Sequence, residues 1–175
     1  SEELAGQNYT SRRDNTWYGT GTGAASISTV TLPMLCNNPM PGMSRCTAAE
    51  ITSRLGVTAN QAVDYLVGDV SREIRNPGGT LRNRTTLLGD IINSTPVVSA
   101  PTDDYGYRSL GTIASINYGT SYSTYVDTTK ATRPAMVYVG ANDGMLHAFH
   151  GGIDADGDVD TVNGGREQFA YIPRA

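Results

Sequence analysis

Residues 135–150 have the sequence AMVYVGANDGMLHAFH, in which two apolar runs of strand length flank Asn142, Asp143 and Gly144. A tight turn between strands selects residues that tolerate positive φ, and Gly144 suits the left-handed position of a bulged hairpin. The stretch therefore predicts strands over 135–141 and 144–150, joined as a β-hairpin.

Two further segments extend this hairpin. The sequence EQFAYIP at 167–173 is a third run of strand length, and residues 96–98, Pro-Val-Val, are a candidate outer or inner strand. About four strands are the content of one blade of a β-propeller. The predicted fold class is mainly β, a partial propeller of about one blade, preceded by two short helices and an irregular N-terminal segment.

The hairpin also contains an aspartate and a histidine, which raises the question of a catalytic pair. Asp143 occupies the turn and His147 lies on the returning strand, and four residues of a strand span about 13 Å. That distance exceeds hydrogen-bond reach, so no catalytic pair is expected. Because His147 shares a face with Met145 and Phe149, we expect a packed histidine satisfied by the backbone. His150 is expected in an exposed loop.

The composition narrows the class of protein. The chain has 175 residues, 38% of them hydrophobic, and a formal net charge of −4. Neutralising phosphates takes clustered Lys and Arg, so this charge argues against a nucleic-acid partner. No apolar run is long enough to span a bilayer. The many glycines, tyrosines and small polar residues are typical of an extracellular β protein rich in turns.

Two short helices are predicted ahead of the β region. The segments 47–55 and 58–67 open with the capping-box patterns Thr-x-x-Glu and Thr-x-x-Gln, and Gly56 and Gly68 follow their last residues. An apolar stripe along the second segment indicates that this helix packs on another element.

The region after the helices changes character twice. Residues 72–84 are expected to form an exposed loop with a turn at 76–79, and residues 85–100 have β character. Residues 102–132 are expected to form a long loop or ragged hairpin. Five tyrosines in it provide either a contact surface or packing against a neighbouring blade: Tyr105, Tyr107, Tyr118, Tyr122 and Tyr125.

Cys36 and Cys46 are the two cysteines of the chain, and the loop between them contains prolines and a glycine that favour chain reversal. In an oxidising compartment a disulfide here would contribute about 2–3 kcal/mol. The alternative is two free cytosolic thiols. The spacing fits neither CxxC redox chemistry nor a four-ligand zinc site.

The predicted organisation is an irregular segment with this disulfide loop over 1–46, a short helical linker over 47–84 and the first part of a propeller over 85–175.

Several linked motifs carry a resemblance to a known family. The run VYVGANDGMLHAF with GGREQFAYIP is similar to the repeat of quinoprotein-type β-propellers. Together with YLVGDVSRE and RNRTTLLGDIINSTPVV, in this order, it resembles the start of the C-terminal propeller of the PilC/PilY family of type IV pilus tip and biogenesis proteins. The resemblance covers residues 61–101 and 133–175.

The resemblance implies a non-catalytic module that is exported through the periplasm to the pilus tip or outer cell surface. It implies a role in pilus assembly or control of retraction and in surface adhesion. The implied partners are pilins, other pilus tip or assembly proteins, and a host or abiotic surface ligand. One blade is only part of a propeller, so we expect a fragment of a larger protein. The alternative is a quinone-dependent dehydrogenase, which would need cofactor contacts from several blades.

The insert GGIDADGDVDTVNGG at 151–165 is longer than the turn usual at this point of the repeat. Aspartates on alternate residues suit Ca²⁺, which takes hard oxygen ligands. Counted from Asp156 as position 1, the spacing has an EF-hand-like register. The predicted ligands are Asp154, Asp156, Asp158, Asp160, the carbonyl of Val162, and Glu167.

Two features depart from that register. Thr161 replaces the glycine that permits the sharp turn, and Glu167 belongs to the predicted third strand. A second register starts at Asp154 and uses Asp160 as its fourth carboxylate. The other interpretation is a solvated acidic loop that keeps the surface soluble. The calcium loop known for the family lies later in the chain, so this insert is not its counterpart.

Overall fold

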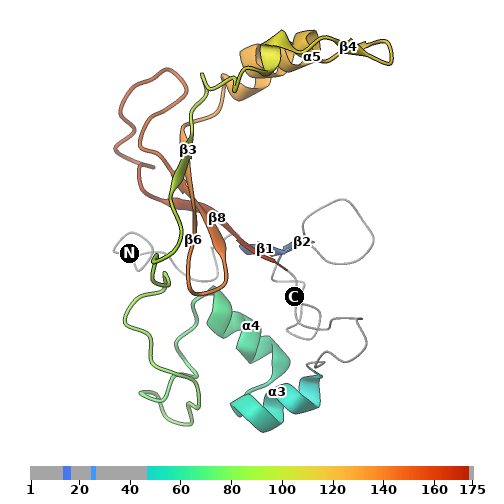
Figure 1. Ribbon diagram of the computed structural model, residues 1–175. Coiled ribbons are helices and arrows are strands. Elements are labelled where there is room, and N and C mark those ends of the chain that lie inside the picture. Colours follow the sequence, from blue (N-terminus) through green and yellow to red (C-terminus); the bar gives the residue numbers. More distant parts are fainter. Residues whose placement is uncertain (1–13, 17–24, 27–46, 174–175) are drawn as a thin grey trace. The chain divides into compact units, whose positions relative to one another are not determined.

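The computed structural model describes residues 14–16, 25–26 and 47–173 (Figure 1). The predicted disulfide of Cys36 and Cys46 lies outside these residues. In the predicted irregular segment, two short strands are described, β1 (Asp14–Thr16) and β2 (Ala25–Ser26), which pair with each other in antiparallel orientation. The described residues fall into two compact units, one of 14–16, 25–26, 47–95, 139–147 and 167–173 and one of 96–138 and 148–166.

Both predicted helices are confirmed. Helix α3 (Ala48–Leu55) and helix α4 (Ala59–Val67) each begin with a complete capping box, in which the N-cap threonine and the third helical residue exchange hydrogen bonds. Gly56 follows α3 in the left-handed conformation with φ of 70°. The apolar faces meet in a small core formed by Ile51, Val57, Ala62 and Leu81, against which Ala59 and Tyr65 pack.

Two residues of the expected exposed loop over 72–84, Glu73 and Leu81, are buried, so the prediction of exposure is wrong for them. Glu73 is fully buried and forms a parallel bridge with Leu81, which is also buried. The Glu73 carboxylate lies 3.0 Å from Nε of Arg84 and 2.6 Å from Nη2 of Arg75. A buried carboxylate requires such cationic partners, and the arginines that supply them lie outside any periodic apolar pattern.

The main sheet has the strand order β2-β1-β8-β7-β6-β3 and is not closed. Its predicted strands are β6 (Met136–Gly140), β7 (Leu146–His150) and β8 (Glu167–Ile172). The candidate fourth strand is β3 (Val97–Ser99), which pairs antiparallel with β6 and is the last strand in this order. Strands β3, β6, β7 and β8 are thus neighbours in the order of the chain, as in one propeller blade.

Strand β3 is much shorter than the predicted β region of 85–100. Residues 85–96 form no strand. Their hydrogen bonds to the hairpin involve side chains and do not form a backbone ladder between strands. The Gly89 N–H donates to the carboxylate of Asp143, and the Ser94 hydroxyl accepts from the N–H of Gly140. Each of these bonds attaches the segment to the hairpin at a single point.

Between β3 and β6 the chain forms a small separate structure. It consists of a 3₁₀ turn η3 (Tyr107–Ser109), a hairpin of β4 (Thr112–Ile113) and β5 (Ile116–Asn117), helix α5 (Tyr118–Thr124) and a π-helix η4 (Tyr125–Lys130). The predicted hairpin is present. Helix α5 differs from the predicted loop, because Tyr, Ser and Thr are weak helix formers and give no helical signal in the sequence. The side chain of Asn117 caps its first turn by accepting from the N–H of Thr120.

Among the described residues, no helix combines the length and apolar character that a membrane crossing requires.

Candidate functional site

The centre of the blade hairpin contains a buried histidine between two carboxylates. His147 on β7 is fully buried, and its Nδ1 lies 2.6 Å from Oε1 of Glu167, the first residue of β8. Its Nε2 lies 3.0 Å from Oδ2 and 3.1 Å from Oδ1 of Asp143. We call Asp143, His147 and Glu167 the carboxylate–histidine cluster.

The turn brings Asp143 within reach of His147. Gly144 has φ of 85°, so the chain reverses immediately after Asp143. The Met145 N–H donates to Oδ1 of Asp143 at 3.1 Å, which directs the carboxylate back over the returning strand. The expected separation of about 13 Å is therefore wrong, because the four residues cross a turn instead of following a straight strand. His147 bonds to carboxylates, whereas backbone partners were predicted.

The two carboxylates make His147 a cation at neutral pH. Burial alone lowers its pKa, but hydrogen bonds to Asp143 and Glu167, with the charges of both groups, raise the pKa from 6.5 to about 9. Burial raises the pKa of Asp143, and the bonds from His147 and from the Gly89 N–H outweigh burial and lower this pKa below 3.8. The imidazolium thus donates from Nδ1 to the Glu167 carboxylate group and from Nε2 to Asp143.

This geometry is structural. Both ring nitrogens of His147 contact carboxylates, and none of its surface is exposed, so no substrate atom can reach it. The bond to Glu167 links β7 to β8, and the bond to Asp143 fixes the turn. The cluster therefore holds the corner of the blade in one conformation.

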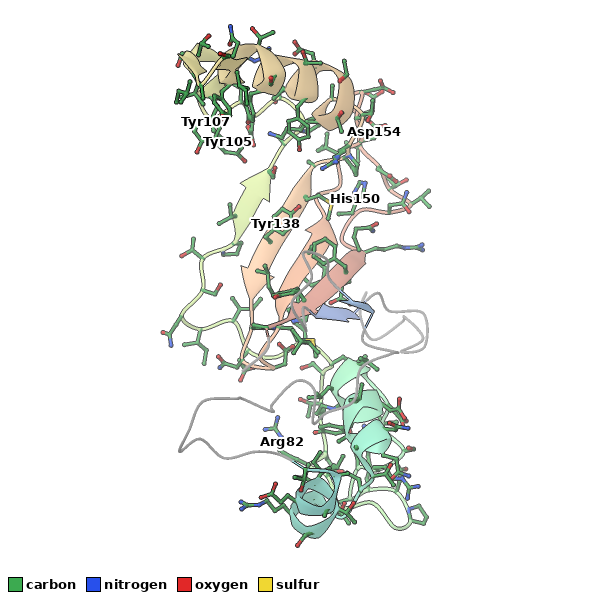
Figure 2. All side chains as sticks on the ribbon, turned by 90° about the vertical axis from the view of Figure 1, so that its right-hand side faces the viewer. Arg82, Tyr105, Tyr107, Tyr138, His150 and Asp154 are labelled. Atoms are coloured by element: carbon green, nitrogen blue, oxygen red, sulfur yellow. The ribbon has the colours of Figure 1, made fainter. Side chains whose placement is uncertain are left out.

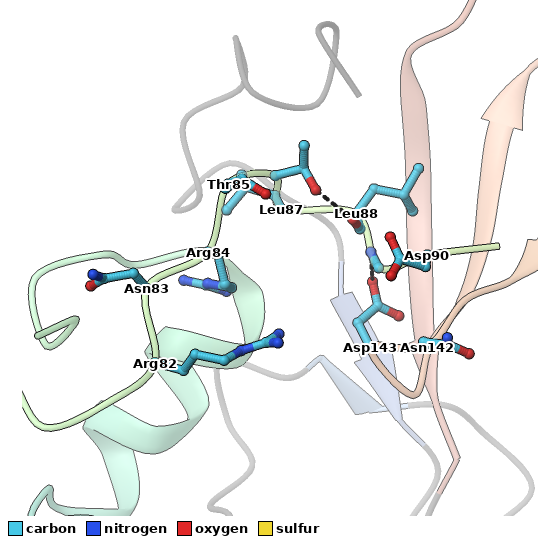
Figure 3. A pocket seen from close by; sticks show the side chains of 11 residues that line it. Arg82, Asn83, Arg84, Thr85, Leu87, Leu88, Asp90, Asn142 and Asp143 are labelled. Carbon is cyan, nitrogen blue, oxygen red and sulfur yellow. Dashed lines mark hydrogen bonds between the residues drawn. The ribbon is translucent and has the colours of Figure 1, made fainter. Parts of the chain in front are cut away.

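Asp143 also contacts the segment that precedes β3. Its Oδ2 accepts from the Gly89 N–H at 2.9 Å (Figure 3). The Asn142 N–H donates to the Asp90 carbonyl at 3.0 Å. A Cβ atom at Gly89 would lie 2.4 Å from the Asp143 nitrogen, so only glycine permits this approach.

A pocket of about 490 Å³ lies beside this contact and is lined by residues 82–90 with Asn142 and Asp143 (Figure 3). Arg84 lines this pocket, and each of its three guanidinium nitrogens donates a hydrogen bond within the protein. Nε donates to Glu73, and the two terminal nitrogens donate to the carbonyls of Tyr65 and Asp69. Its guanidinium also lies 3.8 Å from the centre of the Tyr65 ring. Arg84 therefore supports the fold.

The acidic insert follows His150, the last residue of β7, which is labelled in Figure 2 and is buried. The expectation of an exposed loop histidine is wrong for this residue, because its two nitrogens anchor the insert. Nδ1 accepts from the Gly152 N–H at 3.1 Å, and Nε2 lies 3.5 Å from Oδ2 of Asp160. His150 thus contacts the insert at Gly152, near its start, and at Asp160, in its second half.

The aspartates of the insert bond mainly to the insert's own backbone. Oδ1 of Asp154 accepts from the N–H groups of Asp156 and Asp158. The Asp160 carboxylate accepts from the side chain and the N–H of Asn163 and from the N–H of Val162, and these bonds lower its pKa.

One of the predicted calcium ligands has another partner. The four aspartates and the Val162 carbonyl belong to one insert, whereas the Glu167 carboxylate contacts His147 in the carboxylate–histidine cluster. In the part of the chain that the structure describes, no three His, Cys, Asp or Glu side chains are grouped so as to hold a metal ion. Calcium binding stays a prediction.

The pairing of His147 with Glu167 was not foreseen. The spacing from Asp156 makes Glu167 a predicted calcium ligand, but spacing alone cannot show which residues face each other on adjacent strands. The sequence feature that could have indicated this pairing is His147 on one predicted strand and Glu167 at the start of the next, since a buried charged group needs a partner of opposite charge.

Comparisons with known proteins agree with the blade geometry. The family described as the PilY1 beta-propeller domain matches residues 88–175. A type IV pilus biogenesis factor PilY1 homolog of Xylella fastidiosa is 42% identical over 122 residues, which are 69% of this chain and 8% of the relative. The type IV pilus biogenesis factor PilY1 of Pseudomonas aeruginosa strain PAK is 41% identical over 113 residues, which are 65% of this chain and 8% of the relative.

The chain thus spans less than a tenth of the length of these relatives. No solved structure matches it. The family match covers half of the chain and includes β3, β6, β7 and β8, the four neighbouring strands of the blade. This chain belongs to the PilY1 family of type IV pilus biogenesis factors.

Proposed function

We propose that this chain is a non-catalytic module that acts in type IV pilus assembly, in control of pilus retraction and in surface adhesion. The observation that carries the proposal is its identity of about 40% to relatives named type IV pilus biogenesis factors. The buried carboxylate–histidine cluster supports a non-catalytic role, because its ionisable groups stabilise a strand corner and have no access to substrate.

The proposed location is extracellular, at the pilus tip or outer cell surface, after export through the periplasm. The proposed partners are pilins, other pilus tip or assembly proteins, and a host or abiotic surface. In this oxidising location Cys36 and Cys46 would form the predicted disulfide.

A deletion strain tests the proposal. Removal of the gene should reduce the pilin that can be sheared from the cell surface, and the wild-type gene should restore it. A second deletion, of the retraction motor, separates the two roles: pili return if the protein opposes retraction and stay absent if it is required for assembly. Unchanged surface pilin and unchanged attachment in the first strain would contradict the proposal.

Calcium modulation is a second part of the proposal. The ligands are the carboxylates of Asp154, Asp156, Asp158 and Asp160 with the Val162 carbonyl, and Glu167 completes the register that starts at Asp156. Binding would compete with the backbone bonds that Asp154 and Asp160 now accept, so a modest affinity is expected.

Calorimetry with Ca²⁺ tests this part. Asp156→Ala and Asp158→Ala should weaken binding, whereas Asp90→Ala, an exposed aspartate outside the insert, should not. Asp154→Ala distinguishes the two registers, because only the register that starts at Asp154 uses this side chain as a ligand. No heat at millimolar Ca²⁺ would exclude calcium as a modulator.

A further inference from the structure

The outer edge of β8 is covered by β1, a strand that precedes both helices in the chain. The two strands pair in parallel, with Asp14 opposite Ala170 and Thr16 opposite Ile172 (Figure 1). Strand β2 pairs with the other side of β1 and ends the described sheet in this direction. These three strands belong to the same compact unit. The last strand of the blade is therefore an inner strand of the sheet.

The pairing of β1 with β8 joins segments that are far apart in the chain. Antiparallel neighbours can follow one another through a short turn, whereas a parallel pair needs a long connection. Here the connection includes α3, α4 and the other strands of the blade. Bringing such distant segments together costs chain entropy, so contacts at β8 must offset this cost. Without β1, the backbone groups on this side of β8 would face no strand of the described sheet.

An uncovered β8 would be an edge prone to association. Its sequence, Glu-Gln-Phe-Ala-Tyr-Ile, contains no proline or glycine, and its one charge lies at the first residue. Two of its six residues are aromatic, and aromatic residues favour strands. A strand of this composition that lies exposed at the edge of a sheet is a template for pairing with another molecule. Strand β8 therefore requires a cover.

The two strands beyond β8 have the features with which natural sheets end. The strand length decreases from six residues in β8 to three in β1 and two in β2. Strand β1 consists of Asp, Asn and Thr, and the first two of these residue types are depleted in strands. Very short edge strands offer little backbone to another chain. Together β1 and β2 replace a long edge by a short one.

Strand β8 would keep its place in the sheet if β1 left it. Glu167, the first residue of β8, lies 2.6 Å from His147 on β7, and Ala170 in the middle of β8 is fully buried. The carboxylate–histidine cluster thus anchors β8 on the side opposite β1. Detachment of β1 would expose a formed strand.

We propose that β1 is a protective strand that prevents two copies of the protein from pairing through the outer edge of β8. Two β8 strands related by a two-fold axis would run antiparallel, as in a closed dimer. In the register that pairs all six residues, Glu167 of one copy lies opposite Ile172 of the other, so like charges do not meet. A second copy of β8 thus fits the edge that β1 occupies. The contact involves only this protein and needs no pilus partner.

The test uses the full-length protein that contains this chain. Asn15→Pro removes the N–H at the centre of β1 and prevents its pairing with β8. In sedimentation velocity, the variant should dimerise at least about tenfold more tightly than wild type. In dilute solution, where the monomer dominates, the β8 amides that face β1 should exchange at least about tenfold faster than in wild type. The matched control, Asn15→Ser, keeps the N–H and should behave like wild type.

A second substitution locates the interface of the dimer. Gln168→Lys adds a charge to β8, and charged side chains on an edge strand oppose pairing between molecules. Combined with Asn15→Pro, it should weaken the dimer. Dimerisation that Gln168→Lys leaves unchanged would place the contact elsewhere and overturn the inference. A folded Asn15→Pro variant that stays monomeric would overturn it as well.

Circular dichroism and thermal melting show whether the proline variant is folded. If it is not, Asn15→Cys with Tyr171→Cys replaces it, because these positions lie opposite each other and a disulfide between them would lock β1 on β8. The oxidised form, identified by peptide mass mapping, should dimerise less at high protein concentration than its reduced form. Equal dimerisation of the two forms, or failure of the two cysteines to join, would overturn the inference.

Discussion

The buried imidazolium of His147 is stabilised only together with its two carboxylates. Each ring nitrogen contacts one of them, and Asp143 in turn accepts from two backbone N–H groups. Removing one partner of a buried ionic group commonly costs about 3–5 kcal/mol, because the remaining charge is left uncompensated. The cluster is therefore stable as a unit and sensitive to loss of any member.

Stability should depend on pH through His147. Its pKa is about 9 when folded and 6.5 in its ordinary state, so its contribution is complete below pH 6.5 and is lost as the pH rises through 9. The loss is on the order of 3 kcal/mol. The pKa of Asp143 is lowered from 3.8, so its contribution is present above pH 3.8 and is lost as the pH falls further. Urea unfolding between pH 3 and pH 10 measures both limits.

A matched pair of histidine variants provides the control for this prediction. His147→Gln should lower the stability and remove the decrease between pH 6.5 and 9, whereas His150→Gln should leave that decrease in place. An unchanged slope in His147→Gln would mean that another group titrates in this range.

At the scale of elements, the two capping boxes begin α3 and α4 at defined residues. The hydroxyls of Thr47 and Thr58 accept from the N–H groups of Glu50 and Gln61, at 3.2 Å in both helices. Each cap satisfies donors that a helix end otherwise leaves without a partner.

Thr47→Ala and Thr58→Ala should each lower the free energy of unfolding by about 1 kcal/mol. Thr52→Ala, an exposed position inside α3, should be neutral or slightly stabilising, because alanine has the higher helix propensity. Chemical denaturation followed by circular dichroism compares the three variants. Equal effects at positions 47 and 52 would show that propensity alone determines the outcome.

The tip of the β4–β5 hairpin gives a prediction of opposite sign. Ala114 and Ser115 occupy positive φ, which Asn-Gly accepts with little strain. Ala114→Asn with Ser115→Gly should therefore stabilise the β4–β5 hairpin by about 1 kcal/mol. Slower amide exchange of β5 would confirm the effect, whereas faster exchange would mean that the turn is not the strained point.

At the scale of the whole molecule, the sheet is open and ends at β3 in its strand order. Val97 and Val98 on this strand are 60% and 57% exposed, although β-branched apolar side chains are usually buried. The PilY1 relatives are more than ten times longer than the part matched here, and their family is described as a propeller domain. Further blades would cover such apolar side chains.

Hydrogen exchange tests this view of the sheet. The amide protons of Val97–Ser99 should exchange faster in the 175-residue chain than in a full-length protein of the family, while those of α3 and α4 should be similar in both. Equal protection of β3 in the two proteins would show that this strand needs no further blade.

The sequence by itself determined the local features and the family. Capping boxes, the Asn-Asp-Gly turn and three apolar runs predicted α3, α4, β6, β7 and β8, because each depends on residues close together in the chain. Only the tertiary structure decided which charged groups meet. His147 pairs with Glu167 across two strands, Asp143 bends back to His147 and binds Gly89, and Glu73 is buried with Arg84. These contacts depend on strand register and burial, which are properties of the folded chain as a whole.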